Sequence, residues 1–404
     1  MTDQPSSWAV VRRLLAASST PHQPDLPEAI PWSGMARLAR NYGLGPLLHA
    51  AIQENGLDVP REIGDPLKEA YYRLAAANAV RFQELAKVLA TLSAAGIPVL
   101  VLKGALLAET VYGNLALRPM SDLDLLIPRE RIHEIPQVLA PLGYRLSAGE
   151  AGYSFAYDTL FCGEIILCKD TPVLPVVLDV HWHLLAVEWF HHTGRVDLEA
   201  LWETVCPLRI DGTPARQLCP EDNLLHLCLH AGISHSYVYL LNLIDIDHAI
   251  SIYRDLDWDR FLQRARDFQV RSAAYFGLRF TRDLFDTPIP DRVLNALRPG
   301  RFRCWGVRRL ADPERLVLGA QPPLSRRSRY LLHLALIDSL PGFLRLARYL
   351  FLPSGDWLAT RYALTNPSAV LLARFWHPLR AAGLALAAIA RLAQERLLHR
   401  TTQH

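Results

Sequence analysis

The stretch at residues 121–127 constrains the fold most, because its two aspartates alternate with apolar residues. Successive side chains of a β-strand point to opposite faces, so Asp122 and Asp124 share one face and the intervening leucine lies on the other. Two carboxylates a few ångströms apart repel each other unless a proton or a cation lies between them. The pattern therefore predicts a strand with one buried face and one metal-binding face, and Mg²⁺ suits such oxygen ligands.

A lysine and a glycine stand upstream, at a turn between a predicted strand and a predicted helix. Lys103 and Gly104 follow the apolar run at 99–102 and precede a helix-forming stretch at 105–112. Such a turn offers backbone N–H groups, a helix N-terminus and an ammonium group, which together bind phosphate. The two segments predict a site that binds a nucleotide and Mg²⁺.

A third aspartate lies further along the chain, in a strand predicted at 176–180. Asp179 stands between leucine and valine, and a charge in a buried strand needs a partner, for which the metal site is the natural candidate. His181 and His183 would share the face of Asp179 if the strand continued, a spacing that also fits zinc. Because the Mg²⁺ site already requires Asp179, zinc is the less favoured interpretation.

These motifs resemble the polymerase-beta-like nucleotidyltransferase superfamily, and more closely its bacterial branch, in which a Leu-Lys-Gly turn precedes an Arg-Pro-x-Ser-Asp-x-Asp-Leu-Leu motif. The turn is at 102–104 here and the motif at 118–126. The segment at 178–182 is similar to the family's strand with a third carboxylate. The segment at 220–226 is similar to the start of its C-terminal helical region.

The resemblance implies an enzyme that transfers a nucleoside monophosphate from an NTP to an acceptor hydroxyl and releases pyrophosphate. Asp122, Asp124 and Asp179 would be the catalytic residues. They would also be the metal ligands, for two Mg²⁺ ions or for Mn²⁺ in their place. Asp179 would ligate the ion that activates the acceptor.

The same resemblance implies which residues would contact the phosphates and the acceptor. Lys103 and Gly104 would bind the β- and γ-phosphates. The superfamily's usual Gly-Ser turn is Lys-Gly-Ala here, so the ammonium and backbone N–H groups would replace the serine hydroxyl. Arg118 would contact the triphosphate or cover the edge of the strand, and His181 would line the acceptor pocket.

Two other functions would use the same residues. A non-catalytic nucleotide-binding or scaffold protein would hold a partner with its helices, although the three carboxylates favour an enzyme. An NTP-dependent kinase would use the same metal cage to transfer the γ-phosphate. The expected partners are an NTP and an acceptor, either a protein, a peptide or a small molecule, with RNA less favoured.

Composition indicates an ordinary globular chain. Of the 404 residues 50% are apolar and 21% charged, and the net charge of +3 is too small to indicate nucleic-acid binding by itself. The six cysteines show neither metal-binding spacing nor a dense disulfide pattern. The N-terminus lacks a signal-peptide pattern, and the longest apolar candidate, at 381–390, falls short of the ~20 residues of a membrane span. We therefore expect a cytoplasmic protein without a transmembrane segment.

The periodicity of apolar residues predicts an α+β chain in three regions. Helices are expected at 1–95, a nucleotidyltransferase core with a small mixed sheet and flanking helices at 96–218, and helices again at 219–404.

Short strands within the core predict an antiparallel extension of the sheet. They are expected at 144–146, 153–157, 164–167 and 176–180. A helix should end at Gly143, and Asp211 with Gly212 should form the turn of a hairpin.

For three further groups of residues, a structural role is favoured over a functional one. His226 and His230 are one helical turn apart, as in helical zinc sites, but leucines surround them and packing is favoured. Asp245 and Asp247 lie in a predicted helix, so their side chains should point to different faces. The arginine run from Arg298 to Arg329 is interpreted as a solvated helix face, with a groove for nucleic acid or an acidic partner as the alternative.

Overall fold

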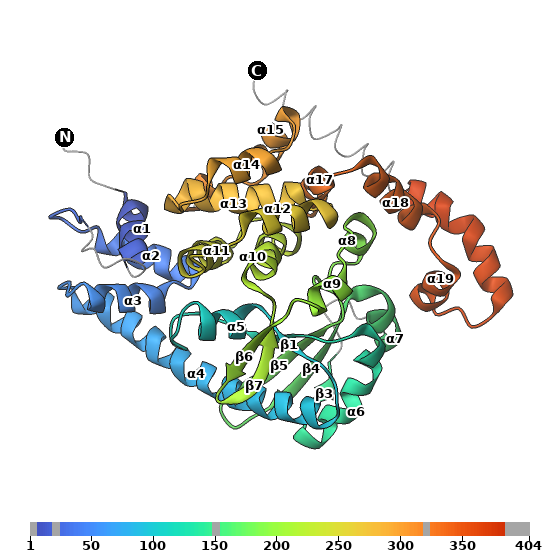
Figure 1. The fold of residues 1–404 in the computed structure, drawn as a ribbon, viewed down its shortest axis with the longest axis horizontal. Helices are drawn as coiled ribbons and strands as arrows, with labels where there is room; N and C mark the ends of the chain where they lie inside the picture. The colour runs from blue at the N-terminus through green and yellow to red at the C-terminus, as the bar shows by residue number, and fades with distance from the viewer. Residues whose placement is uncertain (1–5, 18–24, 148–153, 318–323, 384–404) are drawn as a thin grey trace.

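Five strands form a mixed sheet at the centre of the molecule, in the spatial order β1-β2-β5-β4-β3 (Figure 1). The strands are β1 (Leu100–Val101), β2 (Asp122–Leu126), β3 (Arg145–Leu146), β4 (Glu164–Asp170) and β5 (Pro175–His181). The computed structural model describes residues 6–17, 25–147, 154–317 and 324–383. The α+β class predicted from the sequence is confirmed.

The two strands that carry the aspartates are neighbours in this sheet. β2 pairs with β5 in parallel, and the register places Asp124 beside Asp179. β4 pairs with β5 and with β3 in antiparallel fashion, which confirms the predicted antiparallel extension. The same register places Glu164 opposite His181. Acidic residues from three strands therefore meet on one face.

The opposite face of the sheet is buried against helix α4 (Arg61–Ala94), which runs beneath it (Figure 1). Leu123 and Leu125, which alternate with the aspartates, share an apolar cluster with Leu85 and Leu89 of α4. Helix α6 (Ile135–Leu139) joins this cluster between two 3₁₀ turns, η1 (Arg129–Glu134) and η2 (Ala140–Leu142). Gly143 then ends the helix in a left-handed conformation, as predicted.

A hairpin lies beside the sheet. Its strands β6 (Cys206–Ile210) and β7 (Thr213–Gln217) form a separate two-stranded sheet. Asp211 and Gly212 form its turn with φ values of +47° and +74°, which confirms the predicted hairpin. The short helices of this part of the chain are α5 (Lys103–Thr110), α7 (Phe155–Tyr157), the π-helical turn η3 (Asp158–Cys162), α8 (Glu188–Thr193) and α9 (Leu198–Trp202).

Helices flank the sheet from both ends of the chain. The N-terminal ones are α1 (Ser7–Ala17), α2 (Trp32–Tyr42), α3 (Gly45–Glu54) and α4. They contact the C-terminal helices, for example through the rings of Trp8 and Phe285, whose centroids are 5.5 Å apart. The division at residues 95 and 218 into three domains stays a prediction.

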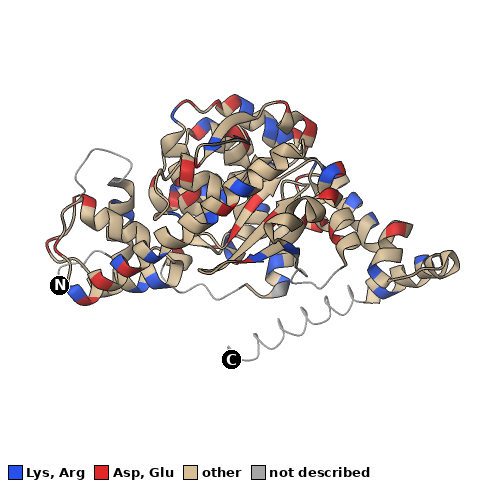
Figure 2. Cartoon of the chain, turned by 90° about the horizontal axis from the view of Figure 1, so that it is seen from below, with Lys and Arg blue, Asp and Glu red and all other residues tan. Residues whose placement is uncertain are grey.

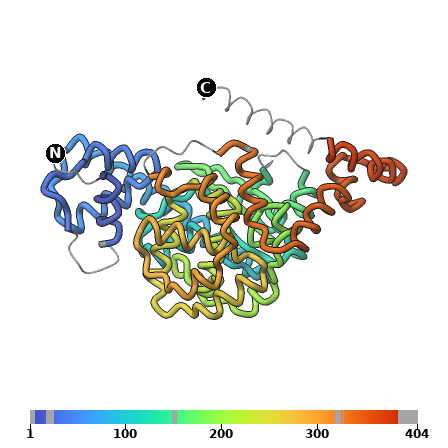
Figure 3. The backbone as a smooth tube through the Cα atoms, turned by 90° about the horizontal axis from the view of Figure 1, so that it is seen from above, coloured from blue at the N-terminus to red at the C-terminus, as the bar shows by residue number. Residues whose placement is uncertain are grey.

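The C-terminal helices cover the acidic side of the sheet and then extend away from it. They are α10 (Pro220–Leu229), the π-helical turn η4 (His230–Ser234), α11 (Leu240–Ile252), α12 (Trp258–Asp267), α13 (Arg271–Phe285), α14 (Asp291–Leu297), α15 (Arg301–Leu310), α16 (Pro313–Val317), α17 (Arg326–Leu336), α18 (Leu340–Phe351) and α19 (Gly355–Tyr362), and residues 367–383 are also helical. Figure 3 shows the first helices and the last ones on opposite sides of the central body.

One predicted strand is wrong. Phe155–Tyr157 forms a short helix, because the hydroxyl of Ser154 accepts a hydrogen bond from the N–H of Tyr157 and caps it. Tyr153, the first residue of that predicted strand, lies outside the described residues, and so does most of the apolar run at 381–390. Within the described ranges, none of the helices has the length and apolar character needed to cross a membrane.

Basic and acidic residues are interspersed along the ribbon (Figure 2). In the arginine run from Arg298 to Arg329, some arginines likewise lie beside acidic residues. Arg303 pairs with Asp338 at 3.3 Å, and Arg308 pairs with Asp283 at 2.6 Å. These two arginines are therefore held by acids of the same chain, as expected for a helix face.

Candidate active site

The turn after β1 brings a lysine and a glycine to the edge of the acidic face. Lys103 begins α5 with φ +47°, a left-handed conformation that costs a non-glycine residue about 1–2 kcal/mol. The N–H of Leu102 donates to the carbonyl of Asp124 at 2.9 Å, which ties the turn to β2. A Cβ atom on Gly104 would lie 3.0 Å from Cβ of Met120. The loop before β2 therefore approaches the helix closely because residue 104 has no side chain.

Asp124 is the most strongly paired of the three predicted carboxylates. Its side chain is buried, and its Oδ1 lies 2.5 Å from Nζ of Lys103 and 3.0 Å from Nε2 of His181. Burial alone would raise the pKa of Asp124, but Lys103 and His181 hold it well below its usual range. Burial likewise opposes the charge on Lys103, and Asp124 raises the pKa of that ammonium. The lysine and the aspartate thus form a buried ion pair.

Asp179 and Glu164 are perturbed in the opposite direction. Burial, followed by the charges of Asp124 and Asp122, raises the pKa of Asp179 to about 7. Burial, followed by the charge of Asp179, raises the pKa of Glu164 to about 8. Within the described ranges, Oδ1 of Asp179 is buried and has no hydrogen-bond partner. These two acids lack the neutralising partner that Asp124 has, so the site favours a further proton or cation.

Three side chains converge closely enough to hold one metal ion. Ligand atoms of Asp124, Asp179 and His181 lie within 4.8 Å of one another. Asp122 is on the same face of β2, and burial and the charge of Asp124 raise its pKa, but it is outside this group of three. The structure therefore brings Asp124 and Asp179 together, places Asp122 beside them and adds an imidazole.

Glu164 is the residue of this cluster that sequence reasoning missed. Its Oε2 lies 3.2 Å from Nδ1 of His181, without the alignment of a hydrogen bond. The signal was its alternation with the buried Ile165 and Leu167, which assigns Glu164 to the face of Ile166. That this face is the acidic one follows only from the pairing of β4 with β5.

His181 lies inside the cluster. Its side chain is 1% exposed, between Asp124 on one side and Glu164 on the other. Burial, followed by the charge of Lys103, lowers the pKa of His181, so the imidazole is held in its neutral form. Its predicted contact with an acceptor stays a prediction.

Arg118 is committed to another part of the chain. Its Nη2 lies 2.7 Å from Oδ2 of Asp245, and its Nε donates to Oδ1 of the same residue at 3.2 Å. The hydroxyl of Tyr112 donates to Asp245 as well, at 2.8 Å. Burial lowers the pKa of Arg118, but Asp245 outweighs it and raises that pKa. Arg118 borders the site while joining the loop before β2 to α11, and its contact with a triphosphate stays a prediction.

A cavity of about 530 Å³ opens onto the acidic face, and we call it the nucleotide-side cavity. Its core wall carries Lys103, Gly104, Arg118, Asp122 and Asp124, and its helical wall carries Asn41, Tyr42, His230, His235, Tyr239 and Asn242. Two buried atoms of the helical wall, Nδ2 of Asn242 and Nδ1 of His230, have no hydrogen-bond partner in the described part of the chain. The cavity thus has a charged end and an end with polar and aromatic side chains.

Among the described residues, the other histidine and aspartate groups singled out in the sequence do not form metal sites. The ring of His183 turns toward that of His191, with centroids 4.1 Å apart, because β5 ends at His181. His226 and His230 are buried one turn apart, and within the described ranges no third ligand completes a site there.

The two aspartates of α11 point to different partners, as predicted. Asp245 contacts Arg118, whereas Asp247 accepts a hydrogen bond from the hydroxyl of Thr287.

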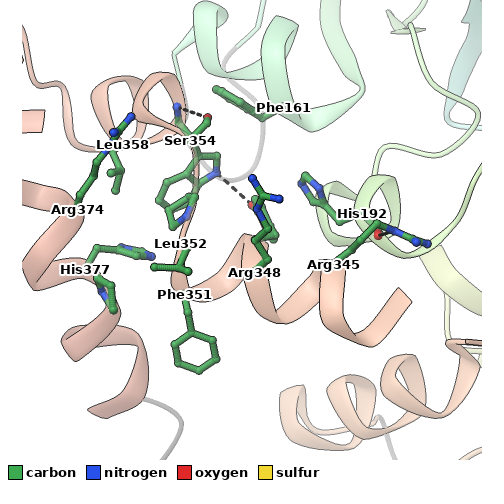
Figure 4. A pocket seen from close by; sticks show the side chains of 14 residues that line it. Phe161, His192, Arg345, Arg348, Phe351, Leu352, Ser354, Leu358, Arg374 and His377 are labelled. Atoms are coloured by element: carbon green, nitrogen blue, oxygen red, sulfur yellow. Dashed lines mark hydrogen bonds between the residues drawn. The ribbon is translucent and has the colours of Figure 1, made fainter. Parts of the chain in front are cut away.

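A cavity of about 680 Å³ lies apart from the predicted site residues, in the C-terminal helices (Figure 4). Arg345, Arg348 and Arg374 line it together with aromatic side chains. Arg345 donates to the carbonyls of His192 and Thr193, at 2.9 and 3.2 Å. None of the residues that the sequence singled out for catalysis or nucleotide binding lines this cavity.

The fold and the site together define a nucleotidyltransferase. Residues 28–286 match the family model described as "Uncharacterised nucleotidyltransferase", and the chain belongs to that family of enzymes. The resemblance to nucleotidyltransferases found in the sequence is thereby confirmed. A search of curated proteins gives no match.

Three solved structures show partial similarity to this chain. The antibiotic-resistance factor ANT(2'')-Ia in solution has 16% identity and a TM-score of 0.30, over 47% of this chain and 91% of that one. The crystal structure of ANT(2'')-Ia in complex with adenylyl-2''-tobramycin has 17% identity and a TM-score of 0.30, over 46% and 97%. An antigenic nucleotidyltransferase-like protein from Paracoccidioides brasiliensis has 17% identity and a TM-score of 0.31, over 48% and 91%.

Proposed function

We propose that the protein is a Mg²⁺-dependent nucleotidyltransferase that transfers a nucleoside monophosphate from an NTP to an acceptor hydroxyl and releases pyrophosphate. The observation that carries the proposal is the convergence of Asp124, Asp179 and His181 beside Lys103, in a member of a nucleotidyltransferase family. The nucleotide-side cavity supports it, because Asp122, Asp124 and Lys103 line this space of about 530 Å³.

The residues of the site fit a divalent cation. Oδ1 of Asp179 is buried without a hydrogen-bond partner in the described part of the chain, and burial, followed by the charges of neighbouring carboxylates, raises the pKa of this acid to about 7. Asp122, Asp124 and Asp179 would hold the metal through oxygen ligands, which Mg²⁺ and Mn²⁺ prefer. When bound, two such ions would polarise the acceptor hydroxyl and neutralise the leaving pyrophosphate.

Lys103 would bind the outer phosphates of the NTP. Its Nζ is 2.5 Å from Oδ1 of Asp124 in the structure, so it lies at the charged end of the nucleotide-side cavity. A bound cation would compete with the ammonium for Asp124, and the triphosphate would offer it another anionic partner. Backbone N–H groups near Gly104, at the start of α5, would add hydrogen bonds to the phosphates.

The nucleoside would lie at the other end of this cavity. Nδ2 of Asn242 is a free donor within the described residues, and Tyr239 offers an exposed ring beside it along the same wall. A base could stack on the ring and accept a hydrogen bond from the amide. Both residues come from the C-terminal helical region, which would therefore complete the site.

The transfer itself forms one bond and breaks one. The acceptor oxygen attacks the α-phosphorus, the bond from that phosphorus to the oxygen bridging to the β-phosphate breaks, and pyrophosphate leaves with the electron pair. The proton of the acceptor hydroxyl passes to the carboxylate of Asp179, whose buried Oδ1 has no hydrogen-bond partner in the described part of the chain. Glu164 lies beside Asp179 and would be a second acceptor for the proton.

The experiment that tests the proposal uses labelled NTPs. The purified protein is incubated with Mg²⁺, a host lysate as the source of acceptor, and each NTP labelled at the α- or the γ-phosphate. The α-label should appear on the acceptor. Transfer of the γ-label would identify a kinase instead, and tight NTP binding without any transfer would identify a scaffold.

A further inference from the structure

A second cavity adjoins the nucleotide-side cavity, and we call it the N-terminal cavity. It has a volume of about 670 Å³ and lies between α2, α3, α4 and the loop before β2. Pro119 and Met120 of this loop line both cavities, and Asp122 stands two residues after Met120. A molecule in the N-terminal cavity would therefore reach the acidic face from a side that the nucleotide does not occupy.

The walls of the N-terminal cavity are mainly apolar. Small residues such as Ala36, Ala39 and Ala77 leave room in it, and Leu67 and Met120 supply apolar surface. Within the described residues, no uncharged polar side chain lines it. A volume of this size suits a small molecule, since ligand pockets typically range over about 300–1,000 Å³.

One arginine of the cavity has no acidic partner. Arg81 is half-buried on α4, and its Nη1 donates to Oδ1 of Asn78 at 3.1 Å. Its Nε is buried without any hydrogen-bond partner, and no carboxylate of the described residues forms an ion pair with it. Burial lowers the pKa of Arg81 while the charge of Asp122 raises it, so the guanidinium is within electrostatic reach of the site.

A half-buried guanidinium without a carboxylate is suited to bind an anion from outside the chain. The other charged residues of the wall, Arg40, Arg73, Glu62 and Glu69, are exposed. Lys103 already serves the phosphates of the nucleotide from the opposite side of the loop. The anion beside Arg81 is therefore assigned to the other substrate.

We infer that the N-terminal cavity binds the acceptor, and that this acceptor is a small molecule with an apolar body, one phosphate or carboxylate group, and a reactive hydroxyl. The inference rests on the proposed function. Arg81 binds the anionic group, the apolar walls hold the body, and the hydroxyl reaches the acidic face from the junction of the two cavities.

Octyl phosphate is a suitable probe, because it has an apolar chain and one anionic group. Calorimetric titration compares it with octanol and with octyltrimethylammonium, below their micelle concentrations and in the presence of Mg²⁺ and ATP. Octyl phosphate should bind at least ten-fold more tightly than either of the other two. Arg81→Gln should abolish this preference, while Arg348→Gln, in the arginine-lined C-terminal cavity (Figure 4), should leave it unchanged.

Ala77→Phe is the second variant and fills the N-terminal cavity without changing a charge. It should block octyl phosphate and leave MgATP binding within two-fold of the wild type, and it decides the case if Arg81→Gln fails to fold. The inference is overturned if octyl phosphate binds both variants as it binds the wild type. It is also overturned if Arg81→Gln loses MgATP as strongly as octyl phosphate, because Arg81 would then bind the nucleotide.

The proposed function fails separately. If the wild type does not bind MgATP at all, the nucleotidyltransferase assignment of the nucleotide-side cavity is wrong. Binding of octyl phosphate in that case would contradict the acceptor role as well, since no nucleotide would be present to react.

Discussion

Replacing Asp179 with asparagine should stabilise the metal-free protein at alkaline pH. Burial and the charges of Asp124 and Asp122 raise the pKa of Asp179 from 3.8 to about 7 in the folded protein. Between these two values the folded protein holds a proton that the unfolded chain has released, so the free energy of unfolding falls as the pH rises through this window. At about 1.4 kcal/mol per pH unit, the fall approaches about 4 kcal/mol by pH 8. Asp179→Asn removes this pH-dependent loss of stability, because asparagine does not titrate.

The assay is denaturant unfolding at pH 5 and at pH 8, with a chelator and with Mg²⁺. With the chelator, the free energy of unfolding of Asp179→Asn should clearly exceed that of the wild type at pH 8, and the difference should be much smaller at pH 5. Mg²⁺ should stabilise the wild type far more than the variant. Asp170→Asn is the matched control, because the side chain of Asp170 is 77% exposed on the adjacent strand β4 and pairs with the similarly exposed Arg145.

The same variant separates metal binding from catalysis. With Mg²⁺, Asp179→Asn should keep much of its NTP binding, because Asp122 and Asp124 remain, and lose transfer by at least ~10²-fold. A result in which Asp179→Asn unfolds more easily than the wild type at pH 8 in chelator would refute the reasoning. Asp179 would then be a structural acid whose charge the fold already neutralises.

Three other perturbations test the site. Lys103→Ala should weaken binding of ATP by much more than binding of AMP, because the ammonium is assigned to the outer phosphates, and calorimetry that finds equal losses would contradict this assignment. NTP binding should require a divalent cation and prefer Mg²⁺ or Mn²⁺ to Zn²⁺; equal NTP affinity in chelator would show that the carboxylates are not a metal site. Gly104→Ala should lower the free energy of unfolding by about 1–3 kcal/mol, because the added Cβ would lie 3.0 Å from Cβ of Met120 and 3.2 Å from Nη1 of Arg118. Denaturant unfolding measures this loss. Gly300→Ala is the control, since a Cβ at Gly300 meets no atom within 4 Å. Equal stability of the two glycine variants would show that the loop adapts.

Much of the fold could be predicted from local patterns in the sequence. The alternation around Asp122 and Asp124 predicted a strand with one apolar face, and the buried side chains of Leu123 and Leu125 confirm it. Gly143 and the Asp211-Gly212 turn were also predictable, since each depends on the backbone preferences of one or two residues. The failure at 155–157 has a local cause too, because the cap from Ser154 outweighed the apolar pattern.

The arrangement of the site depended on contacts that a local pattern does not contain. Glu164 was visible as the first residue of a strand, but its approach to His181 is set by the order of strands in the sheet. The partner of Arg118 is Asp245, on a helix of the C-terminal region. No periodicity of either segment indicates this pair, because it forms only when the helical region packs on the core.

The pair of Arg118 and Asp245 also bears on how a substrate enters. It fastens the loop before β2 to α11, and these two elements form opposite walls of the nucleotide-side cavity. Removing one partner of such a buried pair typically costs about 3–5 kcal/mol, so parting these two walls during each catalytic cycle would be slow. The remaining side of the cavity is formed by Asn41 and Tyr42 at the end of α2, and the hydroxyl of Tyr42 donates to the carbonyl of Leu316. A nucleotide would therefore enter and leave a cavity whose walls are joined to the C-terminal helices at two points, Arg118 and Tyr42.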